Sequence, residues 1–293
     1  MILKQITSNL ISETIYPKGK LILLGQLIDT QYNDNGELVV KQNHGRSLFS
    51  CISHKKEAHI EIITSLPSSD ESLKICCDTI SEKGHTNYGI ISIHKECNYN
   101  NGYYSRIAEA DIIILLGNQS EIHTFLSKNS IGELLHNKYM TDEKFTLIGI
   151  HTAAMALSDE MISKKCTEKG LGFVKECVIY TPTEEQPDYK KLIKSILTQR
   201  NYLGLSIRGG MSMIIEKGYQ AVCKGKGSAM IINARAVTAK SMKPFIRGAS
   251  IYVKNLKGQI LVDGSAVDLR TGTMIKPRAF SYDLNFTKRN NPV

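Results

Sequence analysis

The chain has 293 residues, of which 42% are hydrophobic, and carries 37 Lys and Arg against 28 Asp and Glu, a formal net charge of +9. This length suits one large α/β domain with a sizeable apolar core. The basic residues are scattered rather than gathered in a run of like charges. This pattern favours a solvated basic surface over a nucleic-acid groove and disfavours nucleic acid as a partner.

Several other classes of protein are disfavoured by the composition. The seven Cys form no C-x-x-C pair, which argues against a zinc ribbon or redox motif and favours reduced thiols in a cytoplasmic protein. Residues 1–20 lack the continuous apolar segment of a secretory signal, and no run approaches the about 20 apolar residues of a membrane span. His54 and His59 lack zinc-ligand spacing, so we expect neither a metal nor a cofactor.

Strands alternate with helices through the first two-thirds of the chain. Each predicted strand is almost continuously apolar, which is typical of a parallel sheet covered by helices on both faces. The expected strands are 20–25, 59–64, 88–93, 110–117 and 146–150, and the expected helices are 45–55, 70–82, 119–128, 130–139 and 152–162. The polar stretch 30–43 predicts a turn or hairpin. Residues 17–215 therefore predict a mainly parallel central sheet in a three-layer α/β sandwich.

The pattern of predicted secondary structure changes after about residue 200. Short strands separated by glycine-containing turns are expected at 203–207, 212–215, 220–223, 229–232, 250–253 and 259–262. We assign residues 216–293 to a β-rich C-terminal section. No linker separates it from the rest, so residues 1–293 are predicted to form a single domain.

The predicted strand 146–150 leads into its helix without a turn tract. Gly149 and Ala153 lie two residues either side of His151, and small residues at these offsets are typical of a nucleophile elbow. We therefore expect His151 at a strand-to-helix turn with φ > 0. A hydrolase would carry Ser or Cys there. Three interpretations stay open for His151: it fills the old nucleophile position, it binds a ligand, or it is a new catalytic base.

Two strand ends are predicted to meet at one edge of the sheet, where ligands bind in such folds. One carries His151 and Thr152, and the other carries Gly117, Asn118 and Gln119. Thr152 is the nearest hydroxyl to His151, but adjacent residues at a helix start do not face each other, which makes Thr152 a poor nucleophile. Asn118 is expected to be a helix N-cap and Gln119 to line the site.

Five motifs in chain order resemble the cyanophycinases, which are serine exopeptidases with a fold like the class I glutamine amidotransferases. They are Pro17–Gly25, Ala110–Gln119 with Leu116 replacing a glycine, Gly149–Ala154, Gly170–Phe173 and Val267–Arg270. The resemblance covers most of the chain. It implies a class I glutamine amidotransferase-like, flavodoxin-like sandwich and a homodimer.

The catalytic positions of the resembling family are replaced in this chain. The nucleophile position holds His151, the base position Pro182 and the acid position Gly209. Beside the last of these stands Arg208, which has two open interpretations. It forms a surface ion pair, or it gives the pocket a preference for an anion such as a carboxylate or phosphate.

The resemblance therefore implies a catalytically degenerate cyanophycinase-like protein that acts as a binding or regulatory subunit. Its expected partners are a second copy, an active peptidase or synthetase, and a peptide or amino-acid-derived ligand. The expected ligand set is Gly117, Asn118, Gln119, His151 and Arg208. The alternative is a hydrolase of cyanophycin or β-aspartyl dipeptides with a rearranged catalytic set.

Overall fold

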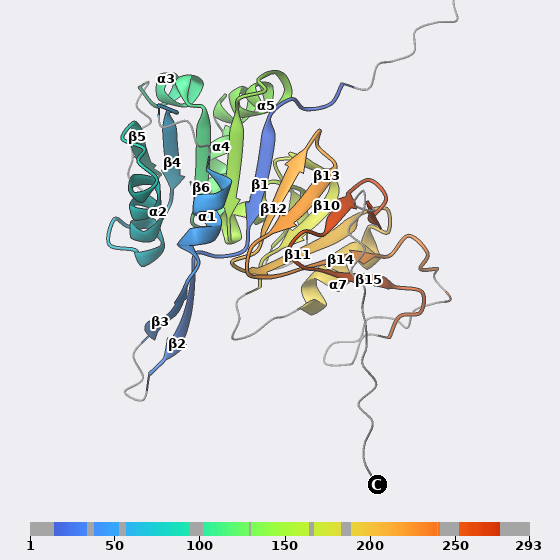
Figure 1. The fold of residues 1–293 in the computed structure, drawn as a ribbon. Helices are drawn as coiled ribbons and strands as arrows, with labels where there is room; N and C mark the ends of the chain where they lie inside the picture. The colour runs from blue at the N-terminus through green and yellow to red at the C-terminus, as the bar shows by residue number, and fades with distance from the viewer. Residues whose placement is uncertain are drawn as a thin grey trace, which may run out of the picture.

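The computed structural model describes residues 15–33, 38–52, 57–93, 102–128, 130–163, 167–182, 189–238, 240 and 252–275. Within these ranges the chain is mixed α/β, with parallel strands in its two large sheets (Figure 1). The helices are α1 (Gly45–Cys51), α2 (Glu71–Glu82), α3 (Gly102–Glu109), α4 (Gln119–Lys128), α5 (Ile131–Thr141), α6 (Thr152–Ala156) and α7 (Tyr189–Thr198). None of these helices is long and apolar enough to cross a membrane.

The larger sheet has nine strands in the order β17-β16-β13-β12-β1-β7-β6-β4-β5. Its strands are β1 (Lys20–Leu24), β4 (Ile60–Thr64), β5 (Tyr88–Ser92), β6 (Ile112–Leu116), β7 (Thr146–Ile150), β12 (Ser212–Glu216), β13 (Gln220–Lys224), β16 (Ala266–Asp268) and β17 (Thr273–Met274). The five strands from β1 to β5 in this order are parallel, and the other four add antiparallel. Strands from 216–275 thus extend the parallel sheet itself.

Successive side chains of the parallel strands point to opposite faces of the sheet. Both sets are apolar, and helices cover both faces. Ile22, Ile62 and Ile148 pack with buried residues of α1 and α2 in one core cluster. Their neighbours in sequence, such as Leu21 and Leu147, pack in a second cluster with α3, α4, α5 and α6. The nearly continuous apolar runs of these strands reflect this two-sided burial.

The smaller sheet has six strands in the order β15-β14-β11-β10-β8-β9 and shares the second core cluster. Its strands are β8 (Ser158–Ile162), β9 (Thr167–Lys169), β10 (Val174–Tyr180), β11 (Leu203–Gly209), β14 (Gly227–Asn233) and β15 (Lys257–Leu261). Helix α7 packs on one face of it, where the side-chain position of Gly204 meets Leu192 and Ile196. A separate hairpin of β2 (Ile28–Tyr32) and β3 (Leu38–Asn43) projects from the body (Figure 1). The polar stretch 30–43 predicted such a hairpin.

The predicted helix 152–162 is wrong beyond residue 156. Helix α6 ends at Ala156, and the chain continues as strand β8. The buried Ser158 hydroxyl bonds the carbonyl oxygens of Met155 and Glu160, at 2.6 and 2.7 Å, and so stabilises the change of direction. Pairing of β8 with β9 and β10 then holds the segment extended. A short apolar run cannot be assigned to helix or strand by periodicity alone.

Two further expectations differ from the structure or lie partly outside it. Helix α3 occupies residues 102–109, where no helix is expected between the strands at 88–93 and 110–117. The strand expected at 250–253 falls partly on residues outside the described ranges, and residues 252 and 253 form no extended strand.

Candidate functional site

The carboxyl ends of three neighbouring parallel strands meet at one edge of the large sheet. Leu24 of β1, Ile150 of β7 and Leu116 of β6 are in register. The residues that follow them are Gly25, His151 and Gly117. The expectation that His151 and Gly117 lie at a common edge of the sheet is therefore confirmed, because the parallel strands before them end in register.

The turn after β7 has the expected elbow geometry. His151 has φ 52° and ψ −126°, outside the main regions open to L-residues, and it precedes the first residue of α6. Its N–H donates to the Leu24 carbonyl at 2.9 Å, and its own carbonyl accepts from Ala154 N–H at 3.0 Å. A side chain at Gly149 would lie 2.9 Å from Ala154 Cα, so only glycine lets the helix fold back this closely. Such a backbone costs about 1–3 kcal/mol and persists only when its surroundings enforce it.

The imidazole of His151 is uncharged at neutral pH. Its Nε2 atom is shielded from solvent and has no hydrogen-bond partner among the described residues. Burial lowers the pKa of His151 to about 4, because the charged form loses its hydration. A neutral imidazole with an unpaired Nε2 offers one hydrogen bond to a ligand from that atom but no charge.

This lowered pKa predicts a loss of stability in mild acid. The unfolded chain binds a proton at His151 near pH 6.5, whereas the folded chain does so only near pH 4. Stability from this group is therefore fully present above pH 6.5 and is lost as the pH falls through this window. At pH 5 the loss amounts to about 2 kcal/mol.

Urea unfolding at pH 7 and pH 5 measures this effect against His151→Gln, which cannot titrate. The wild-type protein should lose about 2 kcal/mol more than the variant between the two pH values. His136, whose pKa burial also lowers, is present in both proteins and cancels in the comparison. Equal losses would show that His151 titrates normally.

Thr152 serves as a structural tie in this arrangement. Its Oγ1 donates to the Gly117 carbonyl oxygen at 2.7 Å and so links the start of α6 to the end of β6. A threonine nucleophile needs a base that accepts its proton. Here a carbonyl takes that hydrogen bond, so the geometry supports no nucleophilic role for Thr152.

Most polar groups of the segment Gly117-Asn118-Gln119 are engaged in hydrogen bonds within the protein. Gly117 has φ 121°, and a Cβ there would lie 2.4 Å from Ser65 Oγ. Asn118 Oδ1 accepts from Ser120 N–H at 2.9 Å, so Asn118 caps α4 as expected. Gln119 Nε2 donates to the Ile162 carbonyl at 2.6 Å, while its Oε1 is shielded and has no partner among the described residues.

The two positions that the resemblance assigns to the base and the acid hold residues without titratable groups. Pro182 is buried just beyond β10. Gly209 ends β11 with φ 55°, and its carbonyl accepts from Gln26 N–H at 2.9 Å. Next to it, a Cβ on Gly25 would lie 2.4 Å from the Gly209 oxygen. Backbone packing therefore brings the end of β1 against the Gly209 carbonyl, whereas a Cβ on Gly209 itself would meet no atom closer than 3.7 Å.

Arg208 lies on the face of the smaller sheet that carries α7. It follows Gly204 and Ser206 at steps of two along β11, and the Gly204 side-chain position meets α7. Among the described residues no hydrogen bond or ion pair joins Arg208 to Gln119 or His151. Whether Arg208 belongs to a ligand site therefore stays a prediction.

Chemically, this edge offers shielded polar atoms but no catalytic pair. No nucleophile there has a base within hydrogen-bond reach in the described structure, and triad chemistry requires one. In the same ranges, no three His, Cys, Asp or Glu side chains gather as metal ligands.

Comparison with known proteins leaves the family open. No protein-family profile matches the sequence, and no curated protein matches it. A 1.5 Å crystal structure provisionally assigned as a peptidase E from Listeria monocytogenes EGD-e aligns with a TM-score of 0.48 and 12% identity. The alignment covers 70% of this chain and 98% of that one. A likeness at this level establishes neither family nor activity.

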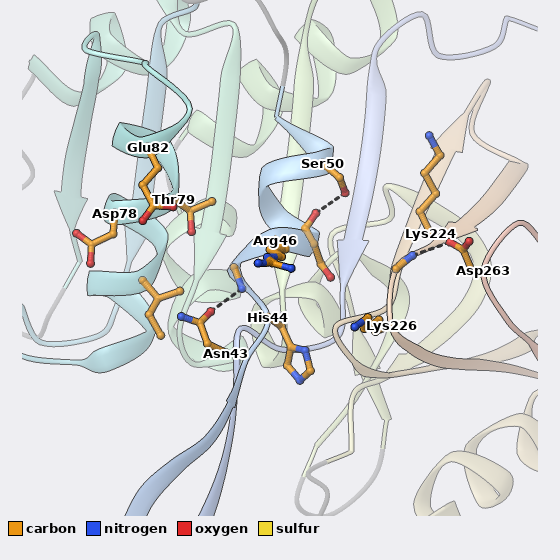
Figure 2. Close-up of a pocket in the computed structure, with 14 residues that line it drawn as sticks. Asn43, His44, Arg46, Ser50, Asp78, Thr79, Glu82, Lys224, Lys226 and Asp263 are labelled. Atoms are coloured by element: carbon orange, nitrogen blue, oxygen red, sulfur yellow. Dashed lines mark hydrogen bonds between the residues drawn. The ribbon is translucent and has the colours of Figure 1, made fainter.

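A large pocket that no sequence pattern indicates lies beside this edge. The pocket measures about 1020 Å³ and opens between α1, α2 and the β13–β14 turn (Figure 2). Neither His151 nor Gln119 lines it. In the sequence, Lys224 and Lys226 belong only to the scattered basic charges. Their relation to α2 is tertiary, so no local pattern could have identified the pocket.

Proposed function

We propose that this protein is a catalytically inactive relative of the cyanophycinase-like peptidases, with a class I glutamine amidotransferase-like sandwich, and that it acts as a binding or partner subunit. The proposal rests on the position and the protonation state of His151. It occupies the strained turn where such a peptidase holds its nucleophile, yet its imidazole is neutral and its Nε2 has no partner among the described residues.

The neighbouring positions support the same proposal. Pro182 supplies no base, and Gly209 supplies no carboxylate. The Thr152 hydroxyl donates to a carbonyl rather than to a base. Triad members act as a unit, and the loss of one or more leaves little beyond the contribution of substrate binding and the oxyanion hole. The proposed assembly is a homodimer, which light scattering tests by a mass of twice the chain.

An activity assay separates this proposal from its alternative. The wild-type protein should release no β-Asp-Arg dipeptide from cyanophycin, and His151→Ser should restore none, because the new hydroxyl lacks a base. Restoring all three groups, with His151→Ser, Pro182→His and Gly209→Glu, should recover at most a trace. A side chain at position 209 has room but must adopt φ 55°.

The alternative is a hydrolase with a rearranged catalytic set, and the unpaired Nε2 of His151 is the observation that favours it. In that case the wild-type protein turns over β-aspartyl dipeptides, and His151→Ala abolishes the turnover. Robust wild-type activity that is lost in His151→Ala would overturn the pseudoenzyme proposal.

A further inference from the structure

The large pocket carries charges of both signs on separate elements. Figure 2 shows Asp78 and Glu82 of α2 on one side and Lys224 and Lys226 on the other, with Arg46 of α1 between them and Asp263 beside Lys224. We call Asp78 and Glu82 the acidic wall, and Arg46, Lys224 and Lys226 the basic wall, whose three positive charges exceed the single negative charge of Asp263 on the same side. No ion pair within 4.0 Å crosses the pocket among the described residues. The pocket therefore keeps opposite charges apart with space between them.

The pocket is built on backbone that cannot shift easily. Ser47 Oγ donates to the Gly210 carbonyl at 2.5 Å, and a Cβ on Gly225 would lie 2.4 Å from the same oxygen. Asp263 accepts from Gly225 N–H at 2.9 Å and fixes the turn that carries the two lysines. The basic wall is thus anchored to α1 and to the end of β11.

The floor of the pocket adds uncharged hydrogen-bonding groups. Ser47 and Thr79 are buried there, and the Asn43 side chain accepts from Gly45 N–H at 2.7 Å at the rim. Small-molecule sites typically measure about 300–1,000 Å³ and combine a few polar groups with apolar surface. This pocket is of that size, with Ile75 as its apolar component.

We propose that this pocket binds a small zwitterion of amino-acid or dipeptide size. Its carboxylate lies against the basic wall, and its ammonium or guanidinium lies against the acidic wall. A polyanion would meet the repulsion of Asp78 and Glu82, and a polycation that of the basic wall. Only a ligand with both charges satisfies both walls with charge-assisted hydrogen bonds. The site does not include His151 and is independent of the proposed function.

Calorimetric titration with three probes tests the proposal at low salt. The dipeptide aspartyl-arginine carries both charges, succinate carries two negative charges, and agmatine carries two positive charges. The wild-type protein should bind the dipeptide at least about tenfold more tightly than either other probe. Equal affinity for succinate, or no dipeptide binding at millimolar concentration, would overturn the proposal.

Neutralising one wall at a time gives the sharper result. Asp78→Asn with Glu82→Gln should weaken dipeptide binding about tenfold or more and should not weaken succinate binding. Arg46→Gln with Lys226→Gln should likewise weaken dipeptide binding about tenfold or more and should not weaken agmatine binding. The matched controls Glu143→Gln and Lys144→Gln change exposed charges between α5 and β7 and should leave all affinities unchanged.

Two further measurements make the test specific to this pocket. His151→Ala should leave dipeptide binding intact, so that failure of this pocket and failure of the proposed function are separable. Thermal unfolding of each wall variant shows whether it is folded. A folded wall variant that binds the dipeptide as the wild type does would contradict the proposal.

Discussion

Replacing Glu61 by alanine is expected to lower the free energy of unfolding by about 3 kcal/mol, at the lower end of the range for breaking a buried ion pair. Glu61 lies in β4 and is 2% exposed. Its carboxylate accepts from Arg106 Nε at 2.9 Å and Nη2 at 2.6 Å, and it bonds His59 Nε2 at 3.0 Å. The hydrogen bonds between Arg106 and Glu61 raise the pKa of Arg106 above its usual range.

The expected loss comes from the partners that remain. Without Glu61, the guanidinium and the imidazole lose the acceptor that the buried side of β4 provides. A Cβ on Gly89 would lie 2.4 Å from Arg106 Nη2, which shows how closely β5 packs on this pair. The Arg106 side chain is 38% exposed and reaches water in part, which keeps the loss near the lower end.

Urea unfolding of Glu61→Ala measures the loss, with the exposed Glu143→Ala as a control that should stay within about 0.5 kcal/mol of the wild type. The double variant Glu61→Leu with Arg106→Met should regain part of the stability, because both charges leave together. A loss below about 1 kcal/mol for Glu61→Ala would show that the pair is effectively solvated.

Gly25→Ala is expected to destabilise the protein by about 3 kcal/mol, the upper part of the range for overpacking. The added methyl group would lie 2.4 Å from the Gly209 carbonyl oxygen and 3.0 Å from the Arg208 carbonyl carbon. Both are backbone atoms, so no side chain can move aside. The hydrogen bonds of Gly25 and Gln26 N–H with Met211 and Gly209, each 2.9 Å long, join β1 to the end of β11 and would have to lengthen.

Gly258→Ala is the matched control for this substitution. Gly258 lies in β15, and a Cβ there meets no atom within 4 Å. Thermal unfolding of the two variants should therefore show a large drop for Gly25→Ala and none for Gly258→Ala. Similar melting temperatures for both would show that the backbone between β1 and β11 accommodates the added methyl group without loss of stability.

The parallel strands were predictable because each is a short apolar run buried on both faces. The runs at 20–25, 59–64, 88–93, 110–117 and 146–150 predicted β1, β4, β5, β6 and β7 to within two residues at each end. The helix expected at 70–82 begins at Asp70, which is its N-cap and whose carboxylate accepts from Ser72 N–H at 2.8 Å. These signals are local, since burial pattern and capping depend on neighbours in sequence.

Segments whose structure depends on distant partners were predicted less well. Residues 158–162 read as a helix, but pairing with β9 and β10 makes them a strand. His59 was considered only as a metal ligand, whereas its partner in the structure is Glu61. In both cases a long-range contact overrides a weak local preference.

The sequence by itself determined the alternation of strands and helices and the turn at His151. Apolar periodicity and the small residues Gly149 and Ala153 specify these features within a few residues of chain. Only the tertiary structure decided that the His151 imidazole is shielded and uncharged, that Gly209 packs against Gly25, and that acidic and basic walls face each other across a pocket. These properties depend on desolvation, close approach and charge placement between segments far apart in the chain, which no local pattern encodes.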